Sequence, residues 1–381
     1  MSADERKEPR GLPKRELGET GESVSVLGMG GFHLLEIPRS EVDAILNGYL
    51  DGGGNYIETS ASYGGGESER KIARAVAGRR DEFLLASKVD ERDGEGAMRT
   101  LERTLSNLQT DHLDIWFMHA AQSVEDVNLM LDEGGAVAAA MKARDQGKIR
   151  FIGVSGHGEP SALLEAVGRF RFDVLMTVVN YYDTFCFPEI EDRLIPLAAQ
   201  KGTAVIGMKA FGDGYLWRSP EKALRYALSR PVSMVVAGIN TPAMLEKDLE
   251  IARRTEPMGD GEIEKLLETA IEYRGYVCRQ CEECLVKTDI PLKRIFELEG
   301  WFDRQMWDGR VYDADDYSMR IRLGPWFDQQ DLARLAYRAE DLAIDPEADY
   351  TGLNGQCRHG LDIDRKLRTA HGKLTSDWRL Y

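Results

Sequence analysis

The first short apolar run of the chain, Val24-Ser25-Val26-Leu27-Gly28, continues as Met29-Gly30-Gly31-Phe32. A doubly wound nucleotide-binding sheet normally follows its first strand with the pattern G-x-G-x-x-G, whose glycines let the backbone approach a pyrophosphate. These glycines do not continue into that pattern. Further runs rich in Val, Ile and Leu recur at intervals of roughly thirty residues, and they are Tyr56–Thr59, Phe83–Lys88, Leu113–His119, Arg150–Ser155, Val174–Asn180, Ala204–Met208 and Met234–Gly238.

The stretches between these runs carry the signals of helices. Ser219-Pro220 has the order of an N-cap followed by a first helical proline. Ser40 is followed three residues later by Asp43, an acidic variant of the capping box. Eight strand–helix units in about 240 residues predict an α/β protein with a (β/α)8 barrel. The doubly wound sheet is the alternative.

Three regions follow from this pattern. Residues 1–13 are expected to be a flexible arm that leads into a short hairpin, and residues 14–255 the barrel. From about residue 256 the alternation stops, and the chain has three close cysteines, many aromatic residues and helical stretches. We therefore predict that residues 256–381 form a smaller, mostly helical C-terminal domain.

The charge of the chain bounds its partners. Its 381 residues include 49 Lys and Arg and 65 Asp and Glu, which gives a formal net charge of −16. An acidic surface repels phosphate backbones, so nucleic acid is not an expected partner. The polar N-terminus lacks the apolar core of a secretory signal, and no apolar run is long enough to span a membrane. We expect a cytoplasmic protein without a membrane partner.

Polar side chains stand where three successive apolar runs end. Glu58 lies in the second run, Lys88 ends the third and His119 ends the fourth, while Tyr63 follows in the loop after the second. Because the C-terminal ends of barrel strands form one mouth, these four side chains are expected to converge. A structural ion pair between Lys88 and Glu58, with Tyr63 as an ordinary loop residue, is the alternative.

This set of side chains suits proton transfer during carbonyl reduction. A lysine ammonium beside a tyrosine stabilises the phenolate and lowers the pKa of the hydroxyl from its usual value near 10. A carboxylate positions the lysine, and a histidine orients the substrate carbonyl. The hydride has to come from a cofactor, since no side chain supplies one.

At these residues the chain resembles the aldo-keto reductases. The family's Asp-Thr-Ala-x-x-Tyr appears as Glu58-Thr59-Ser60-Ala61-Ser62-Tyr63, and Gly64-Gly65-Gly66-Glu67-Ser68-Glu69 is similar to the segment that often follows it. The resemblance runs from about residue 13 to 255. It implies that Tyr63 is the general acid and base, that Lys88 tunes it and that His119 orients the substrate. The fourth catalytic position of the family falls on Glu58.

The resemblance also implies a nicotinamide cofactor, NAD or NADP. Ser155 lies in a segment that resembles the family's Gly-Val-Ser-Asn, which holds the carboxamide, and Gly238 begins the segment that binds the phosphates. The implied cofactor residues are Gly30, Gly31, Ser155, Gly156, Asn180, Met208, Lys209, Gly238, Asn240, Thr241 and Asp248.

Several positions depart from the family's pattern. Glu58 replaces an Asp and is one methylene longer, which changes the geometry of its pair with Lys88. Gly156 replaces an Asn and Met176 a Gln, so two polar contacts to the nicotinamide are expected to be lost. The segment Ile239-Asn240-Thr241-Pro242 contains no Lys or Arg to hold a 2′-phosphate, which favours NAD over NADP. These departures keep open a barrel that turns over weakly or not at all.

Aromatic residues are predicted to line the substrate pocket at the barrel mouth. Walls of this kind, with few charges, suit a small sugar-like or aromatic carbonyl compound or the corresponding alcohol. The predicted pocket residues are Phe32, His33, Trp116, Tyr182, Phe211 and Trp217.

Three of the five cysteines form the motif C-x2-C-x2-C, at Cys278, Cys281 and Cys284. This tight spacing suits three corners of a four-iron cubane, whereas zinc sites use separated pairs. In ferredoxins with two clusters, the cysteine that completes the first cluster comes from the second motif. The sequence before Cys357 resembles such a motif without its first three cysteines, so we predict one 4Fe–4S cluster held by all four. A zinc site, or no metal, is the alternative. The remaining cysteine, Cys186, is expected to be a buried or loop thiol.

The sequence therefore predicts an NAD(P)-dependent oxidoreductase that interconverts a carbonyl and an alcohol and carries one 4Fe–4S cluster in a ferredoxin-like C-terminal domain. The cluster is expected either to clamp the segment 285–356 or to accept electrons from an external donor. The competing hypothesis is an iron–sulfur electron-transfer or regulatory protein whose barrel is catalytically weakened.

Overall fold

The computed structural model describes residues 11–157, 160–181, 183–185, 187–212, 216, 219–254, 256–270, 278, 288–303, 329–357 and 360–376. The chain divides into two compact units. The first comprises Met1–Asn180, Glu189–Phe211 and Ser219–Met258, and the second comprises Tyr181–Pro188, Gly212–Arg218 and Gly259–Tyr381.

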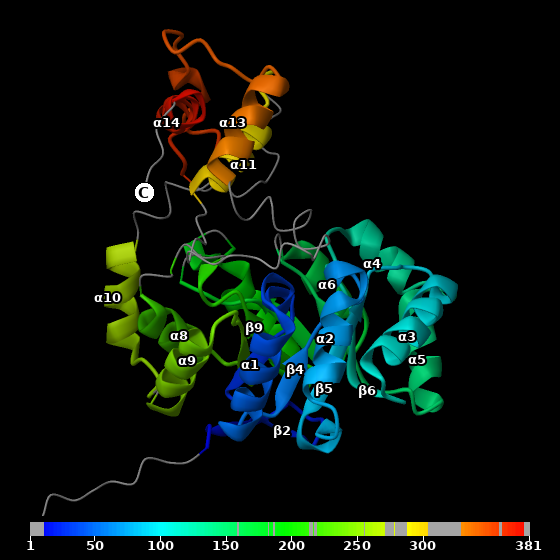
Figure 1. Cartoon of the computed structure of the whole chain (residues 1–381). Coiled ribbons are helices and arrows are strands. Elements are labelled where there is room, and N and C mark those ends of the chain that lie inside the picture. Colours follow the sequence, from blue (N-terminus) through cyan, green and yellow to red (C-terminus); the bar gives the residue numbers. More distant parts are fainter. Residues whose placement is uncertain are drawn as a thin grey trace, which may run out of the picture. The chain divides into compact units, whose positions relative to one another are not determined.

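The first unit is a closed barrel of eight parallel strands (Figure 1). The order around the barrel is β10-β3-β4-β5-β6-β7-β8-β9, so neighbours in the sequence are neighbours in space. This result confirms the barrel and excludes the doubly wound sheet. The strands are β3 (Leu27–Gly30), β4 (Tyr56–Glu58), β5 (Leu84–Val89), β6 (Leu113–Met118), β7 (Ile149–Ser155), β8 (Val174–Val178), β9 (Ala204–Met208) and β10 (Met234–Gly238).

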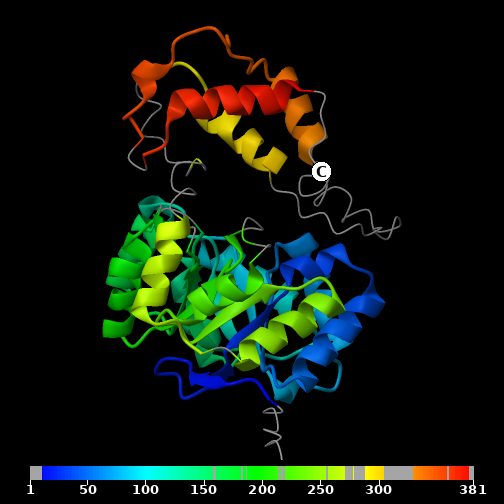
Figure 2. The ribbon, with the colours of Figure 1, turned by 90° about the vertical axis from the view of Figure 1, so that its left-hand side faces the viewer.

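Helices surround the barrel, and Figure 2 shows them on its outside. Strands covered on both faces are continuously apolar, and every residue of β5, β6 and β8 is buried. The α-helices are α1 (Arg39–Asp51), α2 (Glu67–Ala75), α3 (Gly94–Leu108), α4 (Val124–Met130), α5 (Ala136–Asp145), α6 (Ser161–Arg169), α7 (Ile195–Gln200), α8 (Pro220–Leu228) and α9 (Pro242–Arg254). Shorter helical turns are η1 (Phe32–Glu36), η2 (Tyr63–Gly65), η3 (Arg80–Glu82), η4 (Asp183–Phe185) and η5 (Ile190–Leu194).

Two predicted helix starts have different outcomes. Ser219 is the N-cap of α8 and Pro220 its first residue, as predicted, although the Ser219 side chain makes no capping hydrogen bond. The prediction at Ser40 was wrong, because α1 begins at Arg39 after an N-cap at Pro38. Ser40 already lies inside the first turn, so its side chain is not in the N-cap position.

A short hairpin precedes the barrel. It consists of β1 (Lys14–Glu16) and β2 (Ser23–Ser25), which pair antiparallel. The first apolar run is therefore divided. Its residues up to Ser25 belong to the hairpin, and the first barrel strand begins at Leu27.

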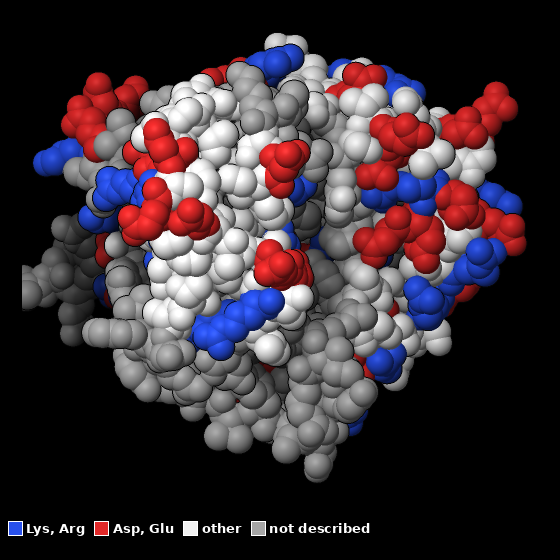
Figure 3. All heavy atoms as spheres, turned by 90° about the horizontal axis from the view of Figure 1, so that it is seen from above, with Lys and Arg blue, Asp and Glu red and all other residues white. Residues whose placement is uncertain are grey.

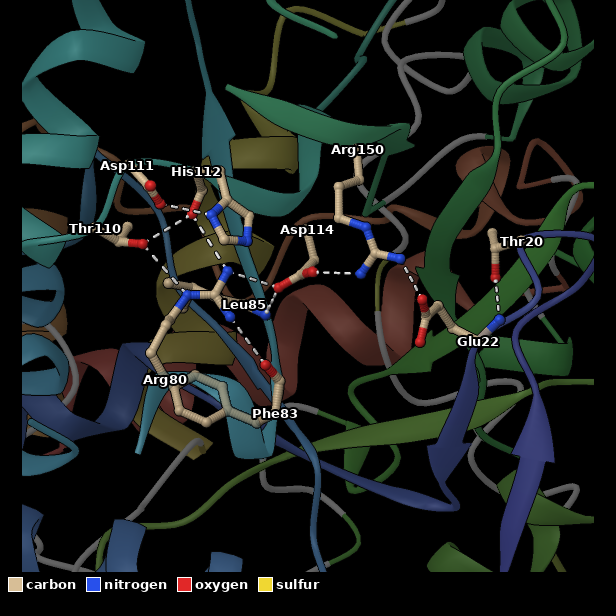
Figure 4. A network of polar contacts seen from close by, with 10 residues as sticks. All are labelled: Thr20, Glu22, Arg80, Phe83, Leu85, Thr110, Asp111, His112, Asp114 and Arg150. Atoms are coloured by element: carbon tan, nitrogen blue, oxygen red, sulfur yellow. Dashed lines mark hydrogen bonds and ion pairs between the residues drawn. The ribbon is translucent and has the colours of Figure 1, made fainter. Parts of the chain in front are cut away.

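A polar network ties this hairpin to the N-terminal ends of the barrel strands (Figure 4). Asp114 of β6 is 2.8 Å from the Arg80 guanidinium through one oxygen and 2.8 Å from the Arg150 guanidinium through the other. The backbone N–H of Leu85 also donates to Asp114, at 2.8 Å. Arg150 continues to Glu22 of the hairpin through a second ion pair. The network thus links β5, β6, β7 and the hairpin at the end of the barrel opposite the mouth.

The described part of the second unit is largely helical. Its helices are α10 (Asp260–Ala270), α11 (Leu292–Asp303), α13 (Gln329–Ala339) and α14 (Ile363–Thr375), with a short turn η10 (Thr351–Leu353). Helix α11 contacts both α13 and α14 (Figures 1 and 2). These helices enclose a separate apolar core, formed by Leu292, Ile295, Phe296, Leu298, Phe302, Ala333, Tyr337, Leu342, Ile344, Leu361, Ile363, Leu367, Ala370 and Leu374.

The surface carries charges of both signs. Figure 3 shows acidic and basic side chains interspersed on the face that it presents. Among the helices that the structure describes, none has the length and apolar character needed to cross a membrane.

Candidate active site

Lys88 lies at the centre of the side chains predicted to be catalytic. It occupies the mouth end of β5 and is only 2% exposed. Its Nζ atom donates to the carboxylate of Glu58, to the carbonyl oxygen of Thr59 at 2.8 Å and to the hydroxyl of Tyr63 at 3.2 Å. Glu58 ends β4 and Tyr63 begins η2, so two adjacent strands and the turn after one of them bring the three side chains together.

Burial dominates the electrostatics of this group. Desolvation lowers the pKa of Lys88 to about 7, although the charge of Asp90 opposes the shift. Desolvation also raises the pKa of Tyr63, and the Asp90 charge adds to this effect. The pKa of Tyr63 therefore shifts in the direction opposite to the one predicted from a neighbouring ammonium, because desolvation is the largest effect on this hydroxyl.

His119 lies beside the tyrosine at the same mouth. The centroids of the two rings are 6.1 Å apart, and the His119 ring is 5.9 Å from that of His157. His119 Nδ1 is 2.6 Å from a carboxylate oxygen of Asp90. Asp90 was not among the predicted site residues, although it stands two residues after Lys88, directly after an apolar strand. Its position at a strand end was the signal that could have identified it.

Ser155 and Asn180 hold the backbone of loops at the mouth. Ser155 is fully buried at the end of β7, and its hydroxyl accepts a hydrogen bond from the N–H of Ala120, the residue after His119. Asn180 donates to the carbonyl oxygen of Lys209, at 3.0 Å. Lys209 has a left-handed backbone with φ of 57° and follows Met208, the buried last residue of β9.

Three of the glycines predicted to contact the cofactor have neighbouring atoms close to the place where a side chain would begin. The N–H of Gly31 donates to the Glu58 carbonyl oxygen at 2.7 Å, and a Cβ at Gly31 would lie 2.6 Å from that oxygen. A Cβ at Gly30 would approach the Glu58 side chain to 3.4 Å, and one at Gly156 would meet Leu163 at 2.9 Å. Packing alone therefore requires a small residue at Gly31 and favours one at Gly156.

A second polar group forms around the end of β10. His33 Nδ1 is 2.6 Å from one oxygen of the buried Glu36, and the Asn240 amide donates to the other oxygen at 2.6 Å. The His33 ring lies against Gly238, where a Cβ would meet it at 2.1 Å. His33 thus lies beside the predicted phosphate-binding segment. Glu36 was not among the predicted site residues, because its partner Asn240 is far away in the chain.

Helix α9 starts directly after this group. The Thr241 hydroxyl accepts from the N–H of Met244 at 2.8 Å and so caps the first turn. Asp248, one turn further on, is 4% exposed, and its Oδ2 has no hydrogen-bond partner among the described residues. Burial raises the pKa of Asp248 to about 7.

The predicted substrate pocket is only partly reproduced. Phe32 lies edge-on to Tyr63, with ring centroids 5.1 Å apart, and so forms a wall beside the proposed proton donor. Phe211 is half-buried after β9. Tyr182 and Trp217 lie outside the described residues.

The prediction for Trp116 was wrong. Trp116 is fully buried and pairs in register with Ser87 of β5. The Ser87 hydroxyl donates to Glu69 of α2 at 2.9 Å, so this position faces the helices outside the barrel. Residues paired in register share a face, and Trp116 therefore also faces the helices. Lys88 is the next residue along and points to the opposite side.

Two of the four cysteines of the predicted cluster are described. Cys278 and Cys357 are half-buried, and both pack against the apolar core of the second unit. Tyr350 and Leu353, which stand where a second ferredoxin motif would have cysteines, pack against the same core. Cys281, Cys284 and Cys186 lie outside the described residues.

Comparison with known proteins gives consistent matches to one family. The model of the Aldo/keto reductase family matches residues 26–222, just over half of the chain. L-galactose dehydrogenase of Arabidopsis thaliana is 26% identical, over 67% of this chain and 94% of that protein.

Solved structures agree on the fold. The holo form of an aldo-keto reductase from Bacillus halodurans has a TM-score of 0.59 at 22% identity and covers 68% of this chain and 96% of its own. An aldo-keto reductase from Klebsiella pneumoniae in complex with NADPH has a TM-score of 0.57 at 19% identity, over 68% and 95%. The barrel, the side chains around Lys88 and the extent of the family match lead to one conclusion: the chain belongs to the aldo/keto reductase family and is an NAD(P)-dependent oxidoreductase of that type.

Proposed function

We propose that the chain interconverts the alcohol and carbonyl forms of a small sugar-like or aromatic compound at the mouth of the barrel, with Tyr63, Lys88, Glu58 and His119 as its catalytic residues. The observation that carries the proposal is the contact of Lys88 with both Glu58 and Tyr63. A structural ion pair would need only the carboxylate. Here the ammonium also reaches a hydroxyl that ends beside Phe32 and His119.

Each side chain has a separate role in this proposal. The hydroxyl of Tyr63 exchanges a proton with the substrate oxygen, and Lys88 donates a hydrogen bond to that hydroxyl and stabilises negative charge on it. Glu58 fixes the position of Lys88, and His119 contacts the substrate oxygen from the other side. A bound nicotinamide would supply or accept the hydride.

The residues around Gly238 fit a nucleotide. Gly238 lets the His33 ring pack directly against its backbone, and the buried Oδ2 of Asp248 can accept a hydrogen bond from an amino group. Ser155 and Asn180 would lie along the nicotinamide end. Because Glu36 adds a carboxylate beside Asn240 and the segment 239–242 after Gly238 contains no basic residue, we propose that NAD is preferred over NADP.

The direct test is Tyr63→Phe, which removes the hydroxyl and keeps the ring. Turnover of NADH and NADPH with a panel of aldoses and aromatic aldehydes, and of NAD and NADP with the alcohols, should fall by about 10² to 10⁴-fold. Tyr226→Phe is the matched control, since Tyr226 bonds to Glu191 away from the mouth. Full activity in Tyr63→Phe would refute the assignment and favour an electron-transfer or regulatory protein.

The sugar-like substrate class has one further support. L-galactose dehydrogenase, which matches the chain over 67% of its length, is named for a sugar.

The cofactor preference is tested by measuring KM for NADH and for NADPH. The KM for NADH should lie at least about tenfold below that for NADPH, since an unmet phosphate charge costs more than one hydrogen bond. A lower KM for NADPH would overturn the NAD preference alone.

We further propose that the second unit holds one 4Fe–4S cluster through Cys278, Cys281, Cys284 and Cys357. Its support is that Cys278 and Cys357, far apart in the sequence, pack against the same apolar core. The half-buried Tyr350 and Leu353 fill space beside that core, as expected where a second cluster has been lost. A cluster here would tie the two ends of the segment 285–356 together.

Metal analysis tests this second proposal. Protein purified without oxygen should contain about four irons and four acid-labile sulfides per chain. Cys357→Ser should lose most of them, whereas Cys186→Ser, which changes the cysteine outside the motif, should retain them. Zinc in place of iron, or full iron content in Cys357→Ser, would contradict the ligand set.

A further inference from the structure

His119 has a carboxylate partner on the side of its Nδ1 atom. Asp90 Oδ1 lies 2.6 Å from His119 Nδ1. The Asp90 side chain is about half exposed, with 48% of its surface accessible, whereas that of His119 is 10% exposed. A carboxylate only accepts hydrogen bonds, so Nδ1 carries the proton in this contact.

The proton on Nδ1 determines what Nε2 can do. In a neutral imidazole one nitrogen donates and the other accepts, so Nε2 of His119 is an acceptor. Burial lowers the pKa of His119, and the charges of Lys88 and Arg92 act in the same direction, while Asp90 opposes them. The hydrogen bond from His119 lowers the pKa of Asp90, with smaller contributions from Ser62 and Arg92. At neutral pH the pair is therefore a carboxylate and a neutral ring.

Among the described residues, the other contacts of the His119 ring are ring contacts and not hydrogen bonds to Nδ1. Tyr63 and His157 contact His119 through their rings, at 6.1 and 5.9 Å between centroids. Arg92 donates to the carbonyl oxygen of Ala120 at 3.0 Å and is paired with Asp126. Asp90 is thus the charged group in direct contact with the ring.

We propose that Asp90 is a positioning residue that holds His119 with an unprotonated Nε2, and that this makes the site select the alcohol form of its substrate. The inference rests on the proposed function, in which His119 contacts the substrate oxygen. In the bound complex an alcohol hydroxyl can donate to Nε2 while its oxygen accepts from protonated Tyr63. When Tyr63 is ionised, the same hydroxyl turns to the phenolate and gives its proton to Tyr63. A carbonyl oxygen has no proton and would face the lone pair of Nε2.

The consequence is a difference in binding, not in the overall equilibrium of the reaction. At neutral pH the KM for the alcohol should be low relative to that for the carbonyl compound. When the pH falls through the pKa of His119, Nε2 gains a proton and becomes a donor, so binding of the carbonyl form should improve. The ratio of the two KM values should therefore depend on pH.

The first experiment reads the tautomer directly and needs no substrate. In ¹⁵N-labelled full-length protein, with His119→Gln to assign the resonance, the His119 ring should show a protonated Nδ1 and a bare Nε2 at pH 7.5. In Asp90→Asn, whose amide can also donate to Nδ1, the resonance should shift toward the other tautomer. A protonated Nε2 in the unsubstituted chain would overturn the proposal.

The second experiment compares KM values with benzyl alcohol and benzaldehyde as probes, between pH 5.5 and 8.5. Asp90→Asn should change the ratio of the two KM values by about tenfold, the value of one hydrogen bond, and flatten its dependence on pH. Asp90→Glu should restore both. Asp126→Asn is the matched control, because it removes a neighbouring carboxylate that does not contact the ring.

The two proposals fail in different ways. Loss of turnover in Tyr63→Phe, together with an unchanged KM ratio and pH profile in Asp90→Asn, would refute only the role of Asp90. Full turnover in Tyr63→Phe would refute the catalytic assignment, while the tautomer measured in the chain itself would still test the Asp90 contact.

Discussion

The Nζ atom of Lys88 lies 3.2 Å from the hydroxyl oxygen of Tyr63 and 4.7 Å from the centroid of its ring. The ammonium is thus placed against the oxygen and the π face of the same side chain. An ammonium in this position can stabilise a phenolate through a charge-assisted hydrogen bond and a contact with the ring face. Because burial opposes charge on both groups, the contact is more sensitive to substitution than an exposed pair.

Lys88→Met should abolish most activity and also destabilise the barrel. We expect kcat to fall by about 10³-fold, the usual range for loss of assisted proton transfer, and the free energy of unfolding to fall by about 3 kcal/mol because Glu58 loses its buried partner. Steady-state kinetics and urea unfolding check the two effects.

Lys71→Met is the control, since Lys71 is also buried but donates to the carbonyl oxygens of Leu34 and Ile37. It should lose stability and keep kcat; a normal kcat in Lys88→Met would contradict the assignment.

The sequence predicted the barrel and the group around Lys88 for a simple physical reason. A strand covered on both faces is apolar throughout, so a titratable residue at its end stands out, and Glu58, Lys88 and His119 were all found in this way. Because these strands are apolar on both faces, the sequence does not show which side chains point into the barrel and which point to the helices. Trp116 was therefore placed in the pocket, although its pairing with Ser87 puts it among the helices.

Contacts between distant segments could not be predicted in this way. Glu36 meets Asn240 across 204 residues, and nothing local to either residue marks the pair. Asp90 could have been noticed from its place directly after β5, but its contact with His119, 29 residues away, could not. The start of α1 was misplaced at Ser40, because a capping pattern in the sequence does not guarantee that the side chain sits at the N-cap.

The network at the closed end of the barrel predicts a pH-dependent contribution to stability. Burial alone would raise the pKa of Asp114, but the Leu85 amide and the two arginines lower it on balance. A carboxyl whose pKa is depressed by folding stabilises the protein above its unfolded value near 4, and this contribution is lost as the pH falls through the folded value. Asp114→Asn should therefore cost about 2 kcal/mol at pH 7 and less at pH 3, measured by urea unfolding. Asp81→Asn, an exposed neighbour, should change neither value, and a cost at pH 3 equal to that at pH 7 would contradict the prediction.

Asp248 predicts the opposite dependence on pH. Burial raises its pKa to about 7, so between about pH 4 and pH 7 the folded chain binds a proton that the unfolded chain has released. Stability should therefore decline as the pH rises through this window. Asp248→Asn removes the ionisation, and it should raise the unfolding free energy at pH 8 by on the order of 1–3 kcal/mol while leaving that at pH 4 nearly unchanged. Thermal unfolding without added nucleotide checks this. Glu246→Gln, exposed on the same helix, is the control, and destabilisation of Asp248→Asn at pH 8 would refute the prediction.

Glu299 holds the helices of the second unit together through buried charge. Its carboxylate is 1% exposed and pairs with Lys366 and Lys373 of α14. Glu299→Gln removes the buried negative charge that both lysines share and should lower the stability of this unit by about 3 kcal/mol, measured by circular dichroism during urea unfolding. Glu297→Gln removes a more exposed pair with Arg294 and should cost about 0.5 kcal/mol.

Turnover measured where only the second unit has unfolded tells whether the barrel works alone. Retained kcat assigns this unit a role outside the chemical step. Loss of kcat in parallel with its unfolding makes it part of the working enzyme.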